Sequence, residues 1–336
     1  MSTTILFTGA TGYIGGAILE RLLDDRSLTI TALVRNVDKA KKLNGLGVAT
    51  IIGSLDDADM LTTAASDADV VYHNADSDHL GAIKAILKGL KQRHEKTGKL
   101  PIFIHTSGTA TVSEQAGGMR GSDKLFPDDD PQWLQEVIPP TAMHRNVELE
   151  ILAADAEGYL KSYIVLPSLI YGTLTGRLAD LGISNKHSIA VPLLVKVGVA
   201  RGQGGMAGEG RNTWPHVEIH EVADLYDIIF RGALAGVAPH GREGYYFAEN
   251  GDVSFGEVAR AYTKTLYNLG KSKTPEPTPF TDEEAQGDFG FLIAVLGSNC
   301  RARSVIAKKL GWKPVKTTED MLNSVSETTE AVVKSL

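Results

Sequence analysis

The chain has 336 residues, 43% hydrophobic and 22% charged, which suits a folded protein with a nucleotide-binding domain and a smaller lobe rather than a disordered one. Its formal net charge is −7, and no segment concentrates basic residues, so we do not expect the protein to bind nucleic acid. A small-molecule substrate is favoured instead. A single cysteine, Cys300, allows no internal disulfide. The sequence shows no signal-peptide pattern and no apolar segment long enough for a membrane helix, so we expect a cytoplasmic protein. We expect it to be a monomer or a homodimer.

The first half alternates short apolar runs with helical periodicity, which predicts βαβ units and a doubly wound parallel sheet of the Rossmann type. Strands are expected near 4–8, 28–34, 48–52, 69–73, 101–106 and 162–167, and helices over 13–23, 80–95 and 141–157. The pattern then becomes glycine-rich and loop-like. We therefore expect a dinucleotide-binding domain over 1–170, joined again by 216–250, and a smaller, mostly helical substrate lobe from 171–215 and 251–336.

A G-x-x-G-x-x-G loop directly follows the first strand and leads into a helix. Glycine permits the tight turn and a close backbone approach, and the amides at the helix start face a pyrophosphate. The residues expected around this group are Gly9, Thr11, Gly12, Tyr13, Ile14 and Gly15. Loops at the carboxyl edge of the sheet are expected to add Leu55 and Asp56 near the adenine, Asn74 and Ala75 near the pyrophosphate and ribose, and also Thr106 and Pro167.

Arg35 follows the second strand, where an acidic residue would bind the ribose 2′-hydroxyl of NAD. A guanidinium at this position pairs instead with a 2′-phosphate, so the sequence favours NADP(H). Asp38, close by, is the residue that argues against this preference, and a merely solvated Arg35 is the alternative.

Several motifs make the chain similar to the extended short-chain dehydrogenase/reductase superfamily, which includes epimerase/dehydratase-like proteins. The resemblance spans nearly the whole chain and rests on Thr8–Gly15, His105–Thr109, Leu166–Gly172, Gly208–Asn212 and His216–Asp224. Two further segments, His144–Glu148 and Gly244–Gly251, are similar to an atypical fungal subgroup. The resemblance implies a nicotinamide cofactor and oxidoreductase chemistry.

In this superfamily a serine or threonine orients the carbonyl, a tyrosine donates the proton, and a lysine four residues later holds the nicotinamide ribose. Hydroxyls are present here at Ser107 and Thr109, although glycine occupies one register of the usual serine. The tyrosine and the lysine are absent. Placing the lysine position at His144 or Arg145 puts Pro140 or Thr141 at the tyrosine position.

His144 and Arg145 are therefore the expected replacements. Histidine changes charge near neutral pH, so His144 could donate a proton itself or hold a water that does. Arg145 could bond the ribose hydroxyls in place of the lysine, although its fixed charge prevents proton transfer. The alternative is that one of them only caps the helix or forms a surface ion pair.

Tyr171, Trp214 and His216 are expected to border the substrate pocket, with simple packing as the alternative for Tyr171. His216, Glu218 and His220 would share one strand face, but their spacing matches no metal motif, and no metal is expected. Gly208 to Arg211 either contact a diphosphate or form a plain surface hairpin.

The sequence thus favours an NADP(H)-dependent reductase of a small carbonyl or imine compound. Two other classes stay open because the tyrosine and lysine are missing: a non-redox protein that senses NADP(H), and an isomerase or cyclase that keeps the fold.

Overall fold

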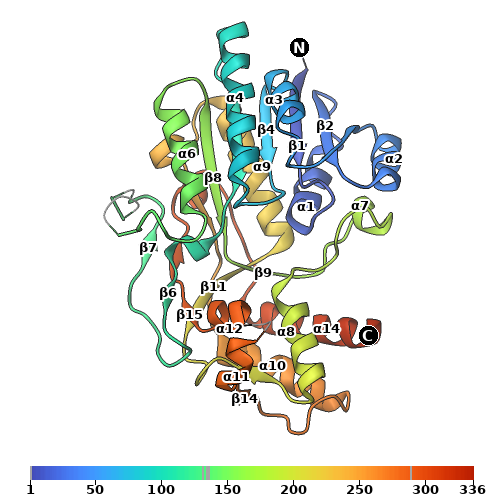
Figure 1. The fold of residues 1–336 in the computed structure, drawn as a ribbon, viewed down its shortest axis with the longest axis vertical. Coiled ribbons are helices and arrows are strands. Elements are labelled where there is room, and N and C mark those ends of the chain that lie inside the picture. Colours follow the sequence, from blue (N-terminus) through green and yellow to red (C-terminus); the bar gives the residue numbers. More distant parts are fainter. Residues whose placement is uncertain (1, 131, 134–136, 288–289) are drawn as a thin grey trace.

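Seven parallel strands form the central sheet of the computed structural model, which describes residues 2–130, 132–133, 137–287 and 290–336 (Figure 1). The strands are β1 (Thr3–Thr8), β2 (Leu28–Val34), β3 (Ala49–Ile52), β4 (Val70–His73), β5 (Ile102–Thr106), β8 (Lys161–Pro167) and β12 (Tyr245–Ala248), in the order β12-β8-β5-β4-β1-β2-β3. The order reverses between β1 and β4, and folds of this kind bind ligands at the carboxyl ends of the strands beside such a reversal.

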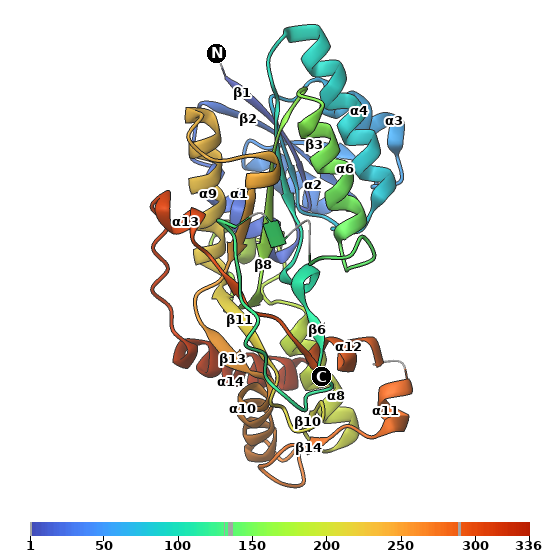
Figure 2. The ribbon, with the colours of Figure 1, turned by 90° about the vertical axis from the view of Figure 1, so that its left-hand side faces the viewer.

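Helices cover both faces of this sheet, as parallel strands require. One face carries α1 (Tyr13–Leu22), α2 (Val37–Gly45) and α9 (Ile219–Ala235), and the other carries α3 (Ala58–Ser66), α4 (Leu80–Thr97) and α6 (Arg145–Ala156). Figure 2 shows α1 and α9 on one side of the sheet and α3, α4 and α6 on the other. The expected doubly wound architecture is confirmed.

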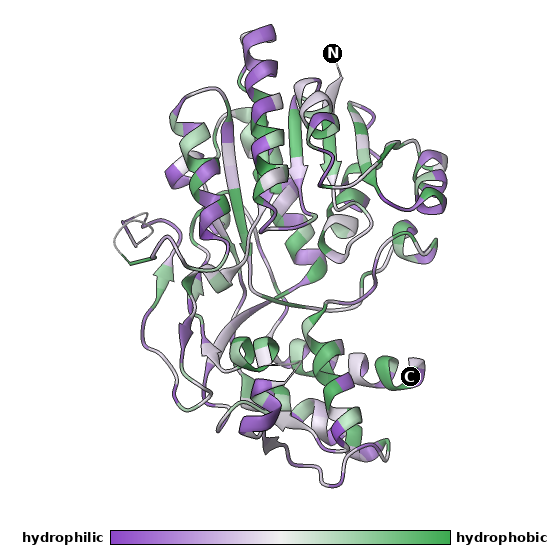
Figure 3. Cartoon of the chain, viewed as in Figure 1, coloured by the Kyte–Doolittle hydropathy of each residue, from purple (hydrophilic) through white to green (hydrophobic). Residues whose placement is uncertain are grey.

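Burial of the strands explains why they read as continuous apolar runs. Every residue of β4 and β5 is buried. In Figure 3 the strands of the central sheet are largely hydrophobic, whereas α2 and the outer end of α4 show hydrophilic surfaces. Alternate residues of each strand pack into two cores, one on each face of the sheet.

The start of α6 differs from the sequence prediction of a helix from residue 141. The helix begins at Arg145, and the residues before it form turns in which the Ala142 amide donates to the Pro139 carbonyl oxygen at 3.0 Å. His144 has a φ of 66°, the only positive φ of a non-glycine residue in the described part of the chain. This left-handed residue breaks the helical hydrogen-bond pattern and sets the helix start.

The second lobe lies beyond the carboxyl ends of the strands (Figure 1). Its elements are β9 (Leu169–Tyr171), α8 (Ala190–Arg201), β10 (Gly205–Met206), β11 (Thr213–Glu218), β13 (Asp252–Ser254), α10 (Phe255–Asn268), β14 (Thr278–Pro279), α11 (Asp282–Gln286), α12 (Gly290–Leu296), β15 (Ser298–Asn299), β16 (Ala302–Arg303) and α14 (Thr318–Ser335). Two short helices pack on the central-sheet domain instead: α7 (Arg177–Asp180) contacts α1, and α13 (Ile306–Lys309) contacts α9 and β12. Short strands β6 (Glu114–Gln115) and β7 (Phe126–Pro127) pair with β15 and β16 and so connect the lobe to the segment after β5.

Part of the later chain returns to the central sheet. Strand β12 pairs with β8, and α9 packs against α1. Residues 213–218 do not return, because β11 pairs with β9 and β13 in a separate three-stranded sheet. None of the described helices is long and apolar enough to cross a membrane.

Candidate functional site

The turn between β1 and α1 is shaped by glycines whose places no side chain can take. A Cβ on Gly9, which has a φ of 79°, would lie 2.5 Å from the Asn74 backbone, and a Cβ on Gly15 would lie 2.2 Å from the Gly9 carbonyl oxygen. Gly12 differs, because a Cβ there would meet only the Gly9 oxygen at 3.2 Å. Gly9 and Gly15 thus serve close packing of the chain on itself, and Gly12 leaves open space at the start of α1.

The start of α1 has the properties of an anion site. Gly12 is its N-cap, no side chain caps the helix, and its first turn contains no acidic residue. Beside it, Asn74 accepts a hydrogen bond from Thr106 Oγ1 at 2.5 Å, while its buried Nδ2 has no partner among the described residues. Free helix amides and an orphaned amide donor fit the pyrophosphate of a dinucleotide.

Other residues expected at this end occupy different environments. Thr11 and Ile14 are partly exposed, and Ala75 is exposed. Tyr13 is buried and its hydroxyl donates to the Gly172 carbonyl oxygen at 2.7 Å, so its side chain connects α1 to the second lobe. Pro167 ends β8 and its carbonyl oxygen accepts from Thr109 Oγ1 at 3.3 Å.

The end of β2 is basic. Arg35 is exposed, and Lys39 follows it on α2; neither forms an ion pair with a described residue. Asp38, the residue that argued against a 2′-phosphate, pairs with Lys41 at 3.3 Å. Asn36 caps α2 by accepting from the Lys39 amide at 2.9 Å. The open cations at this strand end fit a phosphate better than a neutral ribose.

Asp56 anchors the start of α4. His79 Nδ1 accepts from the Ala82 amide at 3.0 Å, so the ring proton is on Nε2, which donates to Asp56 Oδ1 at 3.1 Å. Leu55 packs against the apolar core on the α3 and α4 face of the sheet. These contacts fix both residues in the segment between β3 and α3, and their place beside the adenine stays a prediction.

His144 lies at the carboxyl edge of the sheet, against the backbone of Gly108. Its Nδ1 is 2.8 Å from Asp78 Oδ1 and 3.1 Å from Ser77 Oγ. Pairing with a carboxylate assigns the ring proton to Nδ1 and leaves Nε2 without a partner among the described residues. Nε2 is 3.1 Å from the position that a Cβ on Gly108 would take. The imidazole thus accounts for the glycine at the register of the usual serine.

Sequence reasoning missed Asp78, Glu148 and their contacts. Glu148 is fully buried and accepts from Ser107 Oγ at 2.6 Å and from Thr111 Oγ1 at 3.0 Å. It lies four residues after His144, a helical spacing that could have drawn attention to it. Asp78 comes shortly after β4, where a polar loop at the carboxyl edge of the sheet was the available signal.

Arg145 takes a place other than the one expected at the ribose. It is buried, and its Nη1 donates to Glu148 Oε2 at 3.2 Å and to the Tyr245 hydroxyl at 2.9 Å. Its position directly after the left-handed His144 directs the two neighbouring side chains to different surroundings. Arg145 is therefore a structural residue of the α6 and β12 packing, and we do not include it in the proposed site.

The three residues expected around the substrate pocket pack inside the second lobe. Tyr171 donates to the Thr317 carbonyl oxygen at 3.2 Å, and Trp214 Nε1 donates to the Ser298 carbonyl oxygen at 2.9 Å. His216 is fully buried, with Nε2 2.9 Å from Thr318 Oγ1, and burial lowers its pKa. These contacts satisfy the polar ends of aromatic side chains in a packed core.

A cavity of about 300 Å³ is lined by residues that flank Gly108 and His144 in the sequence, although neither of these two residues lines it. Ala110 and Thr111, from the short helix η1 (Thr109–Val112) after Gly108, line it together with Thr141 to Met143, which directly precede His144. Cys300 also lines the wall, and burial raises the pKa of its thiol to about 12, so it is neutral and unreactive. The cavity and the histidine together form a candidate active site.

Comparison with known proteins agrees with this geometry. A family model described as NAD(P)H-binding matches residues 9–117. The chain is 30% identical to the oxidase ucsJ of Acremonium sp. over 94% of both chains, and 27% identical to an uncharacterized Schizosaccharomyces pombe protein over 94% of this chain and 96% of that one. The fold matches UDP-glucose 4-epimerase of Thermotoga maritima with a TM-score of 0.66 at 16% identity, covering 98% of this chain and 100% of the epimerase. The chain therefore belongs to the same family as the oxidase ucsJ, its N-terminal third matches the NAD(P)H-binding family model, and its fold is that of UDP-glucose 4-epimerase.

Proposed function

We propose that the protein is an NADP(H)-dependent oxidoreductase that reduces a carbonyl or imine group of a small molecule, with His144 in place of the missing tyrosine. The observation that carries this proposal is the His144–Asp78 pair, held against Gly108, together with a cavity lined by Thr141 to Met143, which directly precede His144. The oxidase and the NAD(P)H-binding model among the comparisons support redox chemistry as the class of reaction.

The cofactor preference follows from the end of β2. Arg35 and Lys39 offer two cations to the adenosine ribose, and a guanidinium bonds a phosphate through two parallel N–H groups. At the other end, the α1 amides and Asn74 Nδ2 would hold the pyrophosphate. NADPH, when bound, supplies a hydride to the carbon of the substrate's carbonyl or imine group.

His144 would supply the matching proton. Asp78 holds the proton on Nδ1 and stabilises the positive charge of a doubly protonated ring, so Nε2 can donate its proton to the oxygen or nitrogen that gains charge as the carbon is reduced. Ser107 and Thr109 have a supporting part: their protons are committed to Glu148 and to the Pro167 carbonyl, so these hydroxyls fix the loop that presents Gly108.

The test uses NADPH carrying deuterium at the transferable position and a panel of aldehydes, ketones and cyclic imines. We expect deuterium to appear at the reduced carbon of at least one product, and His144→Gln to slow turnover on the order of 100-fold with unchanged NADPH binding. The matched control is His94→Gln, which changes a half-buried histidine at the far end of α4. Substrate rearrangement without deuterium transfer would support an isomerase and contradict the proposal.

A further inference from the structure

We propose, building on the function above, that the substrate is an organic acid: an apolar body carrying a carboxylate, which Arg301 and Lys124 bind inside the cavity. The two cations come from neighbouring extended segments, because β16 pairs with β7 and the Phe126 amide donates to the Arg301 carbonyl oxygen at 2.9 Å. Most other lining side chains are apolar: Ala110, Val112, Phe126, Val137, Ile138, Pro139, Ala142, Met143 and Cys300.

Arg301 is fixed in place but only weakly neutralised. One Nη donates to the Ser122 carbonyl oxygen at 3.0 Å, and the other lies 3.8 Å from Asp252 Oδ2. Its buried Nε has no hydrogen-bond partner among the described residues. Arg301 therefore keeps donor capacity that a ligand can use.

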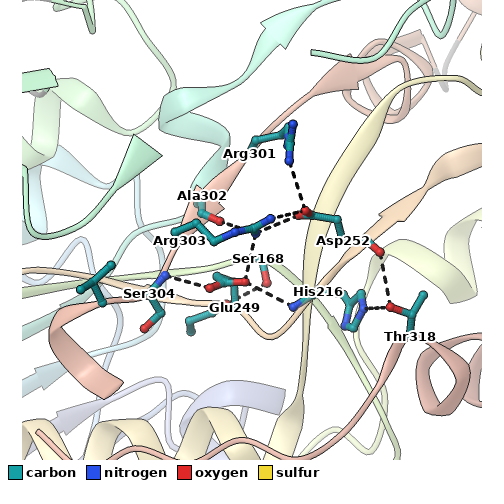
Figure 4. Close-up of polar contacts among 12 residues, drawn as sticks. Ser168, His216, Glu249, Asp252, Arg301, Ala302, Arg303, Ser304 and Thr318 are labelled. Carbon is teal, nitrogen blue, oxygen red and sulfur yellow. Dashed lines mark hydrogen bonds and ion pairs between the residues drawn. The ribbon is translucent and has the colours of Figure 1, made fainter. Parts of the chain in front are cut away.

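Asp252 neutralises Arg301 only weakly because its carboxylate forms a closer ion pair with a second arginine, Arg303. Figure 4 shows Arg303 between Asp252 and Glu249, with Arg301 above the same Asp252 carboxylate. Arg303 forms two hydrogen bonds to the Asp252 carboxylate, at 3.2 and 2.5 Å, and a longer one to Glu249 at 3.4 Å. The stronger, bidentate contact belongs to Arg303.

The charges of this network do not balance. Two carboxylates, Glu249 and Asp252, face three cations, Arg301, Arg303 and Lys308, which leaves one positive charge. Glu249 is buried and is shared by Arg303 and Lys308. The surplus charge thus falls on Arg301, the cation with the longest ion pair and the one that lines the cavity. A partly buried cation of this kind favours an anionic ligand.

Lys124 adds a second cation. Its ammonium lies 5.7 Å from the centre of the Phe126 ring and within 4.0 Å of no carboxylate in the described ranges. Glu114 is the carboxylate that also lines the cavity, and it is paired with Arg120 at 3.0 Å. An arginine and a lysine above apolar walls match a carboxylate attached to an aromatic or aliphatic body. The volume of about 300 Å³ is at the lower end for small-molecule sites, which indicates a compact acid.

The experiment measures binding and turnover separately. Binding of para-toluate and of the neutral para-toluamide is measured by calorimetry in the presence of NADP⁺, and turnover is measured with para-formylbenzoate and its methyl ester. We expect the wild type to bind the acid about tenfold more tightly than the amide, and Arg301→Met to remove most of this preference, with a smaller loss in Lys124→Met.

Two further variants keep the result interpretable. Arg301→Lys, which retains the charge, should retain part of the preference, and Arg211→Met, which removes an exposed arginine paired with Glu209, should not change it. Equal binding of acid and amide, or an acid preference that survives in Arg301→Met, would overturn the inference. Selective acid binding without reduction of para-formylbenzoate or any other carbonyl would leave the inference standing and count against the proposed reaction.

Discussion

The turn between β1 and α1 and the turn before α6 flank the same candidate site, but different properties of the chain define them. The first is a backbone structure: Gly9 and Gly15 leave no room for a Cβ, and the binding groups are main-chain amides. The second depends on side chains, since His144 meets Asp78 on one edge of its ring and Gly108 on the other. A site built from main-chain amides requires glycines at fixed positions, which can be recognised in the sequence. A site built from side chains can change its residues, and so its chemistry, while the fold stays the same.

The largest expected effect concerns the backbone side. Gly12→Val places a branched side chain where the dinucleotide must approach α1, while the extended φ of −80° at this N-cap tolerates any residue. We expect NADPH affinity to fall on the order of 100-fold or more, about 2.7 kcal/mol, with an unchanged circular dichroism spectrum. The control is Gly45→Val, where nothing lies within 4 Å of the added Cβ. If NADPH raises the melting temperature of Gly12→Val as much as that of wild type, the loop has been misassigned.

A comparable effect on turnover, but not on cofactor affinity, is expected on the side-chain side. Gly108→Ala adds a methyl group 3.1 Å from His144 Nε2 on an extended backbone that any residue can adopt. The ring must move from its position, so we expect turnover to drop by about 100-fold with NADPH binding retained. Gly121→Ala, where the nearest atom is 3.6 Å away, is the matched control. Full activity of Gly108→Ala would show that the histidine position does not matter for catalysis.

A smaller change sharpens the cofactor assignment. Arg35→Asp replaces an attraction to the 2′-phosphate by a repulsion, and we expect NADPH affinity to fall by about 2 kcal/mol, roughly 30-fold, so that NADH becomes the better ligand. Arg26→Asp makes the same charge change before the opposite end of β2 and should leave the preference unaltered. Equal affinities for NADPH and NADH in the wild type would contradict this assignment.

The last expected effect is on folding stability rather than on binding or turnover, and it concerns two buried histidines of β4 and β5. His73 and His105 are fully buried with their Nδ1 atoms 3.1 Å apart, and burial lowers the pKa of His73 to about 4 from 6.5 and that of His105 also. The unfolded chain therefore binds more protons, and stability should fall as the pH drops from 6.5 towards 4, by about 1.4 kcal/mol per pH unit for each imidazole.

Denaturant unfolding across this pH range checks the expectation. His73→Gln should give a shallower loss of stability than wild type, by about one imidazole's share, while His94→Gln, at the far end of α4, should follow the wild-type slope. An unaltered slope in His73→Gln would mean that this ring is not the group whose protonation opposes folding.

The sequence carries enough local pattern to predict the sheet, because β4 and β5 are short runs of mainly apolar residues and a glycine turn follows β1. Features that depend on contacts between distant segments could not be predicted in this way. The left-handed His144 that delays α6 depends on the tertiary contacts of the ring, and Arg301 reaches the cavity from a segment far along the chain. Tyr171 was expected at the pocket because it follows the sixth predicted strand, but the small sheet of β9, β11 and β13 buries it, together with Trp214 and His216, in the lobe.

The contact between Gly108 and His144 also constrains how this chain can change over evolutionary time. Restoring a serine at 108 while the histidine is present would push its side chain into the ring, and replacing the histidine first would leave Asp78 without its partner. Either single step passes through a weakened intermediate. The two positions therefore depend on each other, and we expect substitutions at 108 and 144 to be tolerated together better than singly.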